Sequence, residues 1–185
     1  LVVPQHVGRE GERQLRRAPA DEDEAQNEEP ATDAGLAITM NLFLAHHGQA
    51  VGPEVDPQRP LSAVGRATVD RLAALAAERG ARPALVWHSG KLRARQTAEA
   101  CWRACNALAE LSATRDLQPD DPPLWFRDRV RGESRDILIA GHFPHLPRLL
   151  ALLVGDDTAL FPAHGMVALA TDDDGDHWRE LWRIL

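Results

Sequence analysis

Short apolar runs alternate with helix-like segments from residue 40 onward, and this alternation constrains the fold more than any other feature of the chain. The run NLFLAH (41–46) predicts a buried strand, because it is short and apolar. Further strands are predicted at 84–89, 136–142, 165–171 and 177–185, and helices at 62–79, from the second strand to Glu110, and at 146–155. This order indicates an α/β fold, a three-layer sandwich in which a mostly parallel sheet has helices on both faces.

The first 39 residues differ from the rest of the chain. The segment APADEDEAQNEEPATDAG is acidic and has few residues to bury, so residues 1–39 are expected to be a disordered acidic N-terminal extension. They contain nine acidic and four basic residues, so most of the net charge of −7 lies there. Residues 40–185 are expected to form the one folded domain.

Composition limits the partners and the location. A net charge of −7 argues against nonspecific nucleic-acid binding. No apolar run is long enough to span a bilayer, and the first residues lack the layout of a secretory signal, so the expected location is the cytoplasm. Cys101 and Cys105 are one helical turn apart, and we expect buried reduced thiols rather than a disulfide or a metal pair.

The segment DDDGD (172–176) lies between the last two predicted strands and resembles a calcium loop. Its glycine stands at the fourth place instead of the sixth, and no glutamate closes the motif. A hairpin turn is therefore predicted.

Polar side chains collect where three predicted strands end. The first strand ends in HHG (46–48), the second in HSGKLRARQT (88–97), and the third in GHFPH (141–145). Because the carboxyl ends of parallel strands meet at one edge of a sheet, these imidazole, guanidinium and ammonium groups are expected at the same rim. Such a cluster suits an anion, most plausibly phosphate, because arginine offers a planar fork and neutral imidazole is a competent nucleophile toward phosphorus.

These segments resemble the motifs of the histidine phosphatase superfamily, which includes the phosphoglycerate mutases, and most closely the short SixA-type phosphohistidine phosphatases. The resemblance covers nearly all of residues 40–185. It rests, in order, on LAHHGQA (44–50), DPQRPLSAVGR (56–66), HSGKLRARQTAE (88–99) and ILIAGHFPHL (137–146). A phosphoglycerate mutase-like fold is what the resemblance implies.

The resemblance also implies the roles of individual residues. His47 would be the nucleophile that forms a phosphohistidine intermediate, and Arg93 and His142 would clamp the phosphoryl oxygens. The backbone N–H of Phe143 would add a donor, and Gly48 would let the phosphate approach closely. No metal or cofactor is expected, because the cationic side chains stabilise the charge.

Position 46 departs from the family pattern, which has a phosphate-binding arginine there. His46 carrying a proton near a bound dianion could partly substitute for that arginine, but it cannot make the bidentate contact. Lys91 or Arg95 could supply the missing charge or could be surface residues. Both an active enzyme and binding without turnover therefore remain open.

A proton donor is the second open point. Mutase-type members use a carboxylic acid from a loop, and LQPDDPP (117–123) offers Asp120 and Asp121, which could equally form a solvated loop. An imidazole leaving group needs little help, because its own pKa lies near neutrality. A phosphohistidine substrate would thus tolerate the absence of a strong donor.

The expected function is hydrolysis of phosphohistidine on a signalling protein, with a histidine-containing phosphotransfer domain as the expected partner. Three alternatives stay open. They are a small-molecule phosphomonoesterase using the same site, a noncatalytic phosphate-binding module, and a metal hydrolase with His46, His47, His142 and His145 as ligands.

Overall fold

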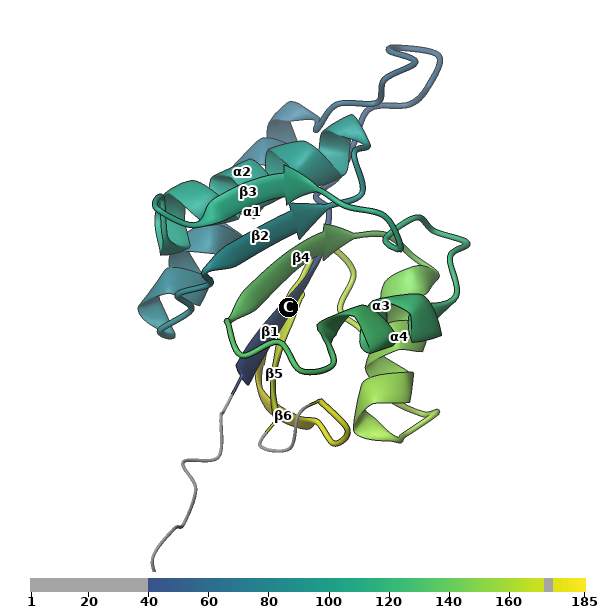
Figure 1. Ribbon diagram of the computed structural model, residues 1–185. Helices are drawn as coiled ribbons and strands as arrows, with labels where there is room; N and C mark the ends of the chain where they lie inside the picture. The colour runs from purple at the N-terminus through teal and green to yellow at the C-terminus, as the bar shows by residue number, and fades with distance from the viewer. Residues whose placement is uncertain (1–39, 172–174) are drawn as a thin grey trace, which may run out of the picture. The chain divides into compact units, whose positions relative to one another are not determined.

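Strands and helices alternate in the structure as the sequence predicts (Figure 1). The computed structural model describes residues 40–171 and 175–185. The strands are β1 (Met40–His46), β2 (Leu85–His88), β3 (Glu110–Ala113), β4 (Ile137–Gly141), β5 (Met166–Thr171) and β6 (Arg179–Ile184). The helices are α1 (Ala63–Glu78), α2 (Leu92–Cys105), α3 (Pro123–Val130) and α4 (His145–Val154).

The strands form one sheet in the order β3-β2-β4-β1-β5-β6. The pairs β3-β2, β2-β4 and β4-β1 are parallel, whereas β1-β5 and β5-β6 are antiparallel. Among these strands, β5 therefore runs against the common direction of the others. The prediction of a mostly parallel sheet is confirmed.

Helices cover both faces of the sheet, which makes the three predicted layers (Figure 1). Phe43 and Ala45 of β1 belong to the core on the α1 and α2 side, whereas Leu42 and Leu44 belong to the core on the α3 and α4 side. Successive side chains of a strand point to opposite faces, so a strand buried on both sides is apolar throughout. Truncation of Leu44 to alanine would cost about 2–5 kcal/mol, as is typical of a fully buried leucine.

The ends of α1 and α4 follow their sequence signals. Ser62 is the N-cap of α1, and its side chain accepts a hydrogen bond from the backbone N–H of Gly65 at 3.0 Å. The buried residues of α1 include Val69, Leu72, Ala73 and Ala76, which recur at helical spacing. Gly155 ends α4 in the left-handed conformation at φ 68°, which glycine adopts without steric cost.

The segment after the second strand was predicted wrongly. Helix α2 ends at Cys105 instead of Glu110, because Asn106 turns its side chain to the backbone of Pro83 and Leu108. The residues that follow form β3, an edge strand beside β2. Its side chains are exposed or half-buried, so it lacks the apolar run that marks the other parallel strands.

Helix α3 was not predicted either. It has eight residues, and only Phe126 and Val130 on it are buried. A single buried pair at a spacing of four residues gives no periodic pattern that a sequence could reveal.

Both cysteines are buried and free, as predicted. Burial raises the pKa of the Cys101 thiol, and the neighbouring Cys105 adds to this shift. These thiols therefore pack as small apolar side chains of α2.

Two predictions concern residues outside the described ranges. The N-terminal extension lies wholly outside them, and so does most of the predicted turn at 172–176. The strands on either side of that turn, β5 and β6, are antiparallel neighbours in the sheet. Within the described ranges, none of the helices combines the length and the apolar character that crossing a membrane requires.

Candidate active site

The site lies at the carboxyl ends of β1 and β4, which are parallel neighbours. His46 at the end of β1 pairs with Gly141 at the end of β4, and the backbone N–H of His47 donates to the carbonyl of Gly141 at 3.2 Å. This register places His47 and His142, each the first residue after its strand, with ring centroids 5.0 Å apart.

Arg93 reaches the same point from the first turn of α2. Its Nε donates to Nε2 of His47 at 3.2 Å. Burial lowers the pKa of the Arg93 guanidinium, and the nearby charge of Arg59 lowers it further. The structure thus brings His47, Arg93 and His142 together, as the motifs predicted.

The hydrogen bonds of His47 determine which ring nitrogen is free. Nδ1 lies 2.8 Å from the carbonyl oxygen of Gly48, which can only accept, so Nδ1 carries the ring proton. Nε2 is unprotonated, and its single lone pair accepts the hydrogen bond from the guanidinium of Arg93. Burial lowers the pKa of His47 to about 4, although the bond to Gly48 opposes this shift. At neutral pH the ring is therefore uncharged and nucleophilic at Nε2.

His142 is almost fully buried beside it, with 1% of its surface exposed. Its Nε2 lies 2.6 Å from Oγ of Ser89, the residue that follows β2. Burial lowers the pKa of His142 to about 2, and the nearby His47 and Arg93 add to this shift. Nδ1 of His142 has no hydrogen-bond partner among the described residues. An anion bound here would favour the protonated ring.

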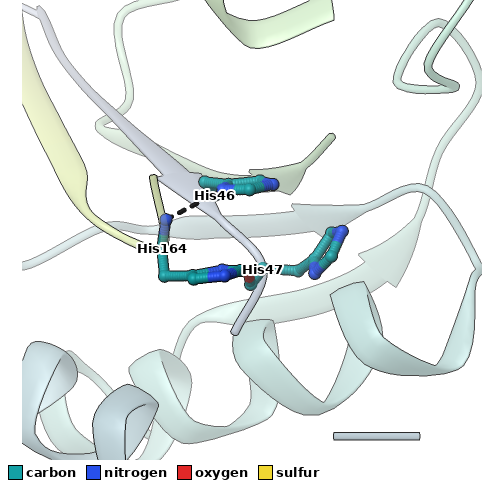
Figure 2. Close-up of side chains that lie close together, drawn as sticks. All are labelled: His46, His47 and His164. Atoms are coloured by element: carbon teal, nitrogen blue, oxygen red, sulfur yellow. Dashed lines mark hydrogen bonds between the residues drawn. The ribbon is translucent and has the colours of Figure 1, made fainter. Parts of the chain in front are cut away.

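His46 is held between two aromatic rings. The ring of Phe143 stacks on it with centroids 4.1 Å apart and planes at 9°, and His164 stacks on it at 4.9 Å and 4°. The backbone N–H of His164 also donates to Nδ1 of His46 at 2.8 Å (Figure 2). Because Nδ1 accepts, the proton of the neutral ring lies on Nε2. Burial lowers the pKa of His46 to about 3.

This arrangement changes the interpretation of His46. The sequence suggested a protonated ring that stands in for the family's arginine. In the structure His46 is a neutral donor with a fixed tautomer, since adding a proton at Nδ1 would break the bond to His164. The residue that fixes it, His164, lies in the loop before β5 and was not predicted. No local pattern marks it, because its partner is 118 positions away.

Gly48 packs closely against α1, which the sequence did not predict. A Cβ atom at this position would lie 2.5 Å from Cγ2 of Val69 and 2.9 Å from the carbonyl oxygen of Gly65, both on α1. Its N–H donates to Oγ1 of Thr97 at 3.2 Å, and that hydroxyl donates to the carbonyl of Arg93 at 2.8 Å. Close packing on α1 by itself requires glycine here, and close approach of phosphate at Gly48 stays a prediction.

Phe143 follows His142 directly, so its backbone N–H lies at the same strand end. Its ring has a role that the sequence did not suggest, because it covers one face of His46 and meets Phe161 edge-on at 5.8 Å. A phosphate contact of its N–H stays a prediction.

The two predicted proton donors have different surroundings. Asp121 lines a pocket of about 510 Å³ together with Ser89 and Trp125. Its Oδ2 accepts from the backbone N–H of Gln118 at 2.8 Å, and the Gln118 side chain donates to the carbonyl of Ser89 at 2.7 Å. Asp120 is exposed and does not line this pocket. The structure therefore favours Asp121 over Asp120.

Lys91 and Arg95 lie beside the site rather than on a remote surface. Both line a pocket of about 530 Å³ that Arg93 also lines, and Arg59 completes the group of cations. Arg59 was not predicted as a site residue, although it stands in the DPQRPLSAVGR segment. Its position became evident only from the fold of the loop before α1.

The histidines that lie close enough to hold a metal ion differ from the set that the sequence suggested. Within the described ranges, His46, His47 and His164 offer ring nitrogens that lie within 4.8 Å of one another. His145 is fully buried and outside this group. Nδ1 of His164 lies 2.7 Å from the carbonyl of His47 and therefore carries the ring proton. His47 and His164 thus have a lone pair on Nε2, whereas His46 has a proton on Nε2. These bonds argue against a metal centre built on the three rings.

Comparisons with known proteins agree with this geometry at the level of fold. No protein-family model and no curated protein matches the sequence. A structure from Agrobacterium tumefaciens assigned as the phosphohistidine phosphatase SixA is 24% identical, with a TM-score of 0.66 over 79% of this chain and 97% of that one. The protein histidine phosphatase SixA complexed with tungstate is 22% identical, with a TM-score of 0.68 over 78% and 96%.

A phosphoglycerate mutase from Plasmodium falciparum shares the same architecture. It is 16% identical and has a TM-score of 0.59 over 78% of this chain and 89% of that one. The chain therefore has the phosphoglycerate mutase-like fold of the histidine phosphatases, the SixA type included, as its motifs predicted.

Proposed function

We propose that this protein is a phosphatase that hydrolyses phosphohistidine on a signalling protein through a covalent phosphohistidine intermediate. The observation that carries the proposal is the contact between His47 and Arg93. Nε2 of His47 is an unprotonated nucleophile, and the guanidinium lies 3.2 Å from it. A phosphorus atom approaching Nε2 would therefore lie within reach of the cation that stabilises its oxygens.

The first step transfers the phosphoryl group to the enzyme. The Arg93 N–H moves from Nε2 of His47 to a phosphoryl oxygen, and the freed lone pair of Nε2 attacks phosphorus. As the new N–P bond forms, the P–N bond to the substrate imidazole breaks, and that imidazole, protonated on its other ring nitrogen, leaves as a neutral ring. The Gly48 carbonyl stabilises the ring during attack, because it accepts the hydrogen bond from Nδ1–H while the ring becomes positive. In this proposal Arg93, the Nε2–H of His46 and a His142 that the bound anion protonates are the ligands of the phosphoryl oxygens.

The second step releases phosphate. Water attacks phosphorus, the bond to Nε2 breaks, and His47 returns to its neutral form with inorganic phosphate as the product. A SixA structure of the same fold is complexed with tungstate, a tetrahedral oxyanion like phosphate, which supports an oxyanion as the ligand. The expected protein partner is a phosphorylated histidine-containing phosphotransfer domain.

The test is rapid-quench trapping of the phosphoenzyme. The purified protein is mixed with a phosphohistidine-bearing phosphotransfer domain and quenched in base, in which phosphohistidine survives. Wild type should retain label that is lost on acid treatment, and His47→Ala should retain none. If neither protein retains label and neither releases phosphate, the site binds without turnover and the proposal is wrong.

A small-molecule phosphomonoesterase is a second candidate, favoured by the pocket beside Ser89. Its volume of about 510 Å³ is within the range of small-ligand sites, and Asp121 in its wall could protonate an alkoxide. Parallel assays decide between the two functions. Rapid turnover of p-nitrophenyl phosphate or sugar phosphates, with the phosphoprotein untouched, would favour the second.

A further inference from the structure

A pocket next to the proposed catalytic site is lined by four positive side chains. It has a volume of about 530 Å³, and its polar walls come from the loop before α1 and from the start of α2. The cations are Arg59, Lys91, Arg93 and Arg95, and none of the residues lining the pocket is acidic. Arg93 is shared between this pocket and His47.

Most of this positive charge is not neutralised by the protein. Arg95 pairs with Glu99 one turn along α2, with a separation of 2.7 Å. None of the ion pairs seen between described residues involves Arg59, Lys91 or Arg93. Like charges gathered around one cavity without counter-charges repel one another, so an anion that enters the cavity is stabilised.

Arg59 is held toward this cavity by its backbone. It has φ of 51°, a left-handed conformation that long side chains seldom adopt. Its N–H donates to the carbonyl of Asp56 at 2.9 Å, and its Nε donates to the carbonyl of Val51 at 3.3 Å. Strained residues held in this way are frequent at ligand sites.

The fields of these cations reach the catalytic groups. After burial, the largest cause, the positive charge of Arg59 contributes to lowering the pKa of Arg93. Arg59 also contributes to the lowered pKa of His47, and Lys91 to that of His142. The pocket and the proposed phosphoryl site are therefore adjacent, with Arg93 shared between them.

We propose that this pocket binds a second oxyanion of the substrate, at Arg59, Lys91 and Arg95, while Arg93 holds the phosphoryl group that reacts at His47. The inference rests on the proposed function. The second oxyanion is either an acidic side chain near the phosphohistidine of a protein or a further phosphate of a small molecule. The chemistry of recognition is the same in both cases.

Binding of small probes tests the pocket without any turnover. Methylenediphosphonate carries two oxyanions and resists hydrolysis, whereas methylphosphonate carries one. Titration calorimetry on the wild-type protein should give a dissociation constant for methylenediphosphonate about tenfold or more below that for methylphosphonate. Equal dissociation constants for the two probes would overturn the inference.

Substitutions in the pocket test whether its cations cause the difference between the two dissociation constants. Lys91→Met and Arg95→Met remove one charge each and keep the apolar stem, so the fold is retained. Each should reduce the ratio of the two dissociation constants by about threefold or more. Arg127→Met is the matched control, because Arg127 lies on α3 across the sheet, pairs with Asp128 and does not line the pocket. If Arg127→Met lowers the ratio as much as the pocket variants do, the effect is one of net charge and the inference is wrong.

Peptides distinguish the two sources of the second oxyanion. A phosphohistidine peptide with flanking glutamates is compared with the same peptide carrying glutamines. A glutamate preference in kcat/KM of about threefold or more that both pocket variants reduce supports an acidic protein segment. Preference for methylenediphosphonate without preference for glutamate supports a second phosphate. Failure of the proposed function is recognised separately, because phosphoramidate, with one phosphoryl group, would then not be hydrolysed by the wild-type protein.

Discussion

The backbone N–H of His164 donates to Nδ1 of His46 across 2.8 Å, and the two imidazole rings stack with centroids 4.9 Å apart. This relationship fixes the tautomer of His46, so its Nε2 is a hydrogen-bond donor without charge. A backbone donor remains when the His164 side chain is replaced. The side chain at position 46 is therefore the more informative one to change.

His46→Arg should keep turnover or raise it. A planar guanidinium can occupy the slot between Phe143 and His164, and it adds a charge and a second donor for the phosphoryl group. The measurement is kcat/KM with a phosphohistidine protein, with His46→Ala as the control that should lose activity. A large loss in His46→Arg would mean that the neutral donor is itself required.

The effects of Asp121→Asn and Asp120→Asn on kcat should differ, and the effect of Asp121→Asn should depend on the leaving group of the substrate. Asp121 lines the pocket beside Ser89 and Asp120 does not, so Asp120→Asn should change little with any substrate. Asp121→Asn should lower kcat for an alkyl phosphate by about 10²-fold or more, because an alkoxide leaves poorly without a proton. It should change kcat for phosphohistidine by less than about tenfold, because imidazole leaves readily. Equal losses with both substrates would assign Asp121 a role in folding or binding.

Stability should fall as the pH is lowered from 7 to 5.5. Burial lowers the pKa of His46, His47 and His142 to about 3, 4 and 2, well below the ordinary value of 6.5. The unfolded chain therefore binds more protons than the folded one in this window, and acid favours unfolding. Each such histidine adds up to about 1.4 kcal/mol per pH unit to the slope. Urea unfolding at several pH values measures it.

One variant separates the contribution of the buried histidines to this pH dependence from the contribution of the carboxylates. His142→Gln removes a ring that takes up a proton in the unfolded chain but stays neutral in the folded protein, so the free energy of unfolding should depend less steeply on pH over the same window. A slope equal to that of wild type would mean that His142 is protonated in the folded state.

Gly48→Ala should destabilise the protein by about 1–3 kcal/mol, because its Cβ would overlap Val69 and the carbonyl of Gly65. Gly52→Ala is the control, because a Cβ there meets the carboxylate of Glu54, which can move. Thermal unfolding of both variants is the measurement. A Gly48→Ala protein that is as stable as wild type but does not bind phosphate would mean that glycine is needed here for the close approach of phosphate.

Removal of metal ions should leave activity unchanged. The hydrogen bonds of His46, His47 and His164 leave the proton of His46 on its Nε2, and the proposed steps use imidazole and guanidinium groups. Turnover after dialysis against EDTA, compared with the untreated protein, is the measurement. Loss of turnover that zinc restores would support a metal centre on these rings.

The sequence was sufficient for five of the six strands and for the convergence of His47, Arg93 and His142. Strands buried on both faces are apolar runs, and the groups that follow β1 and β4 meet because parallel strands end at one edge. His47 and His142 were predictable for this reason. Arg93 was predictable because it opens the helix after β2.

Features that depend on contacts between residues far apart in the sequence were not predictable. The position of His164 depends on a loop that folds back onto β1, and the packing of Gly48 depends on the approach of α1. Strand β3 has one neighbour and few buried side chains, so its residues continue the helical pattern of the sequence before them. The cavity at Arg59 likewise follows from the path of a loop.

Phosphorus-31 NMR of the trapped phosphoenzyme tests the central claim most directly, because it identifies the phosphorylated nitrogen. We expect one phosphorus signal from an Nε2-phosphohistidine at His47, absent in His47→Ala, because Nδ1 of this ring is hydrogen-bonded to the carbonyl of Gly48. A signal from an Nδ1-phosphohistidine, or one that persists in His47→Ala, would contradict it.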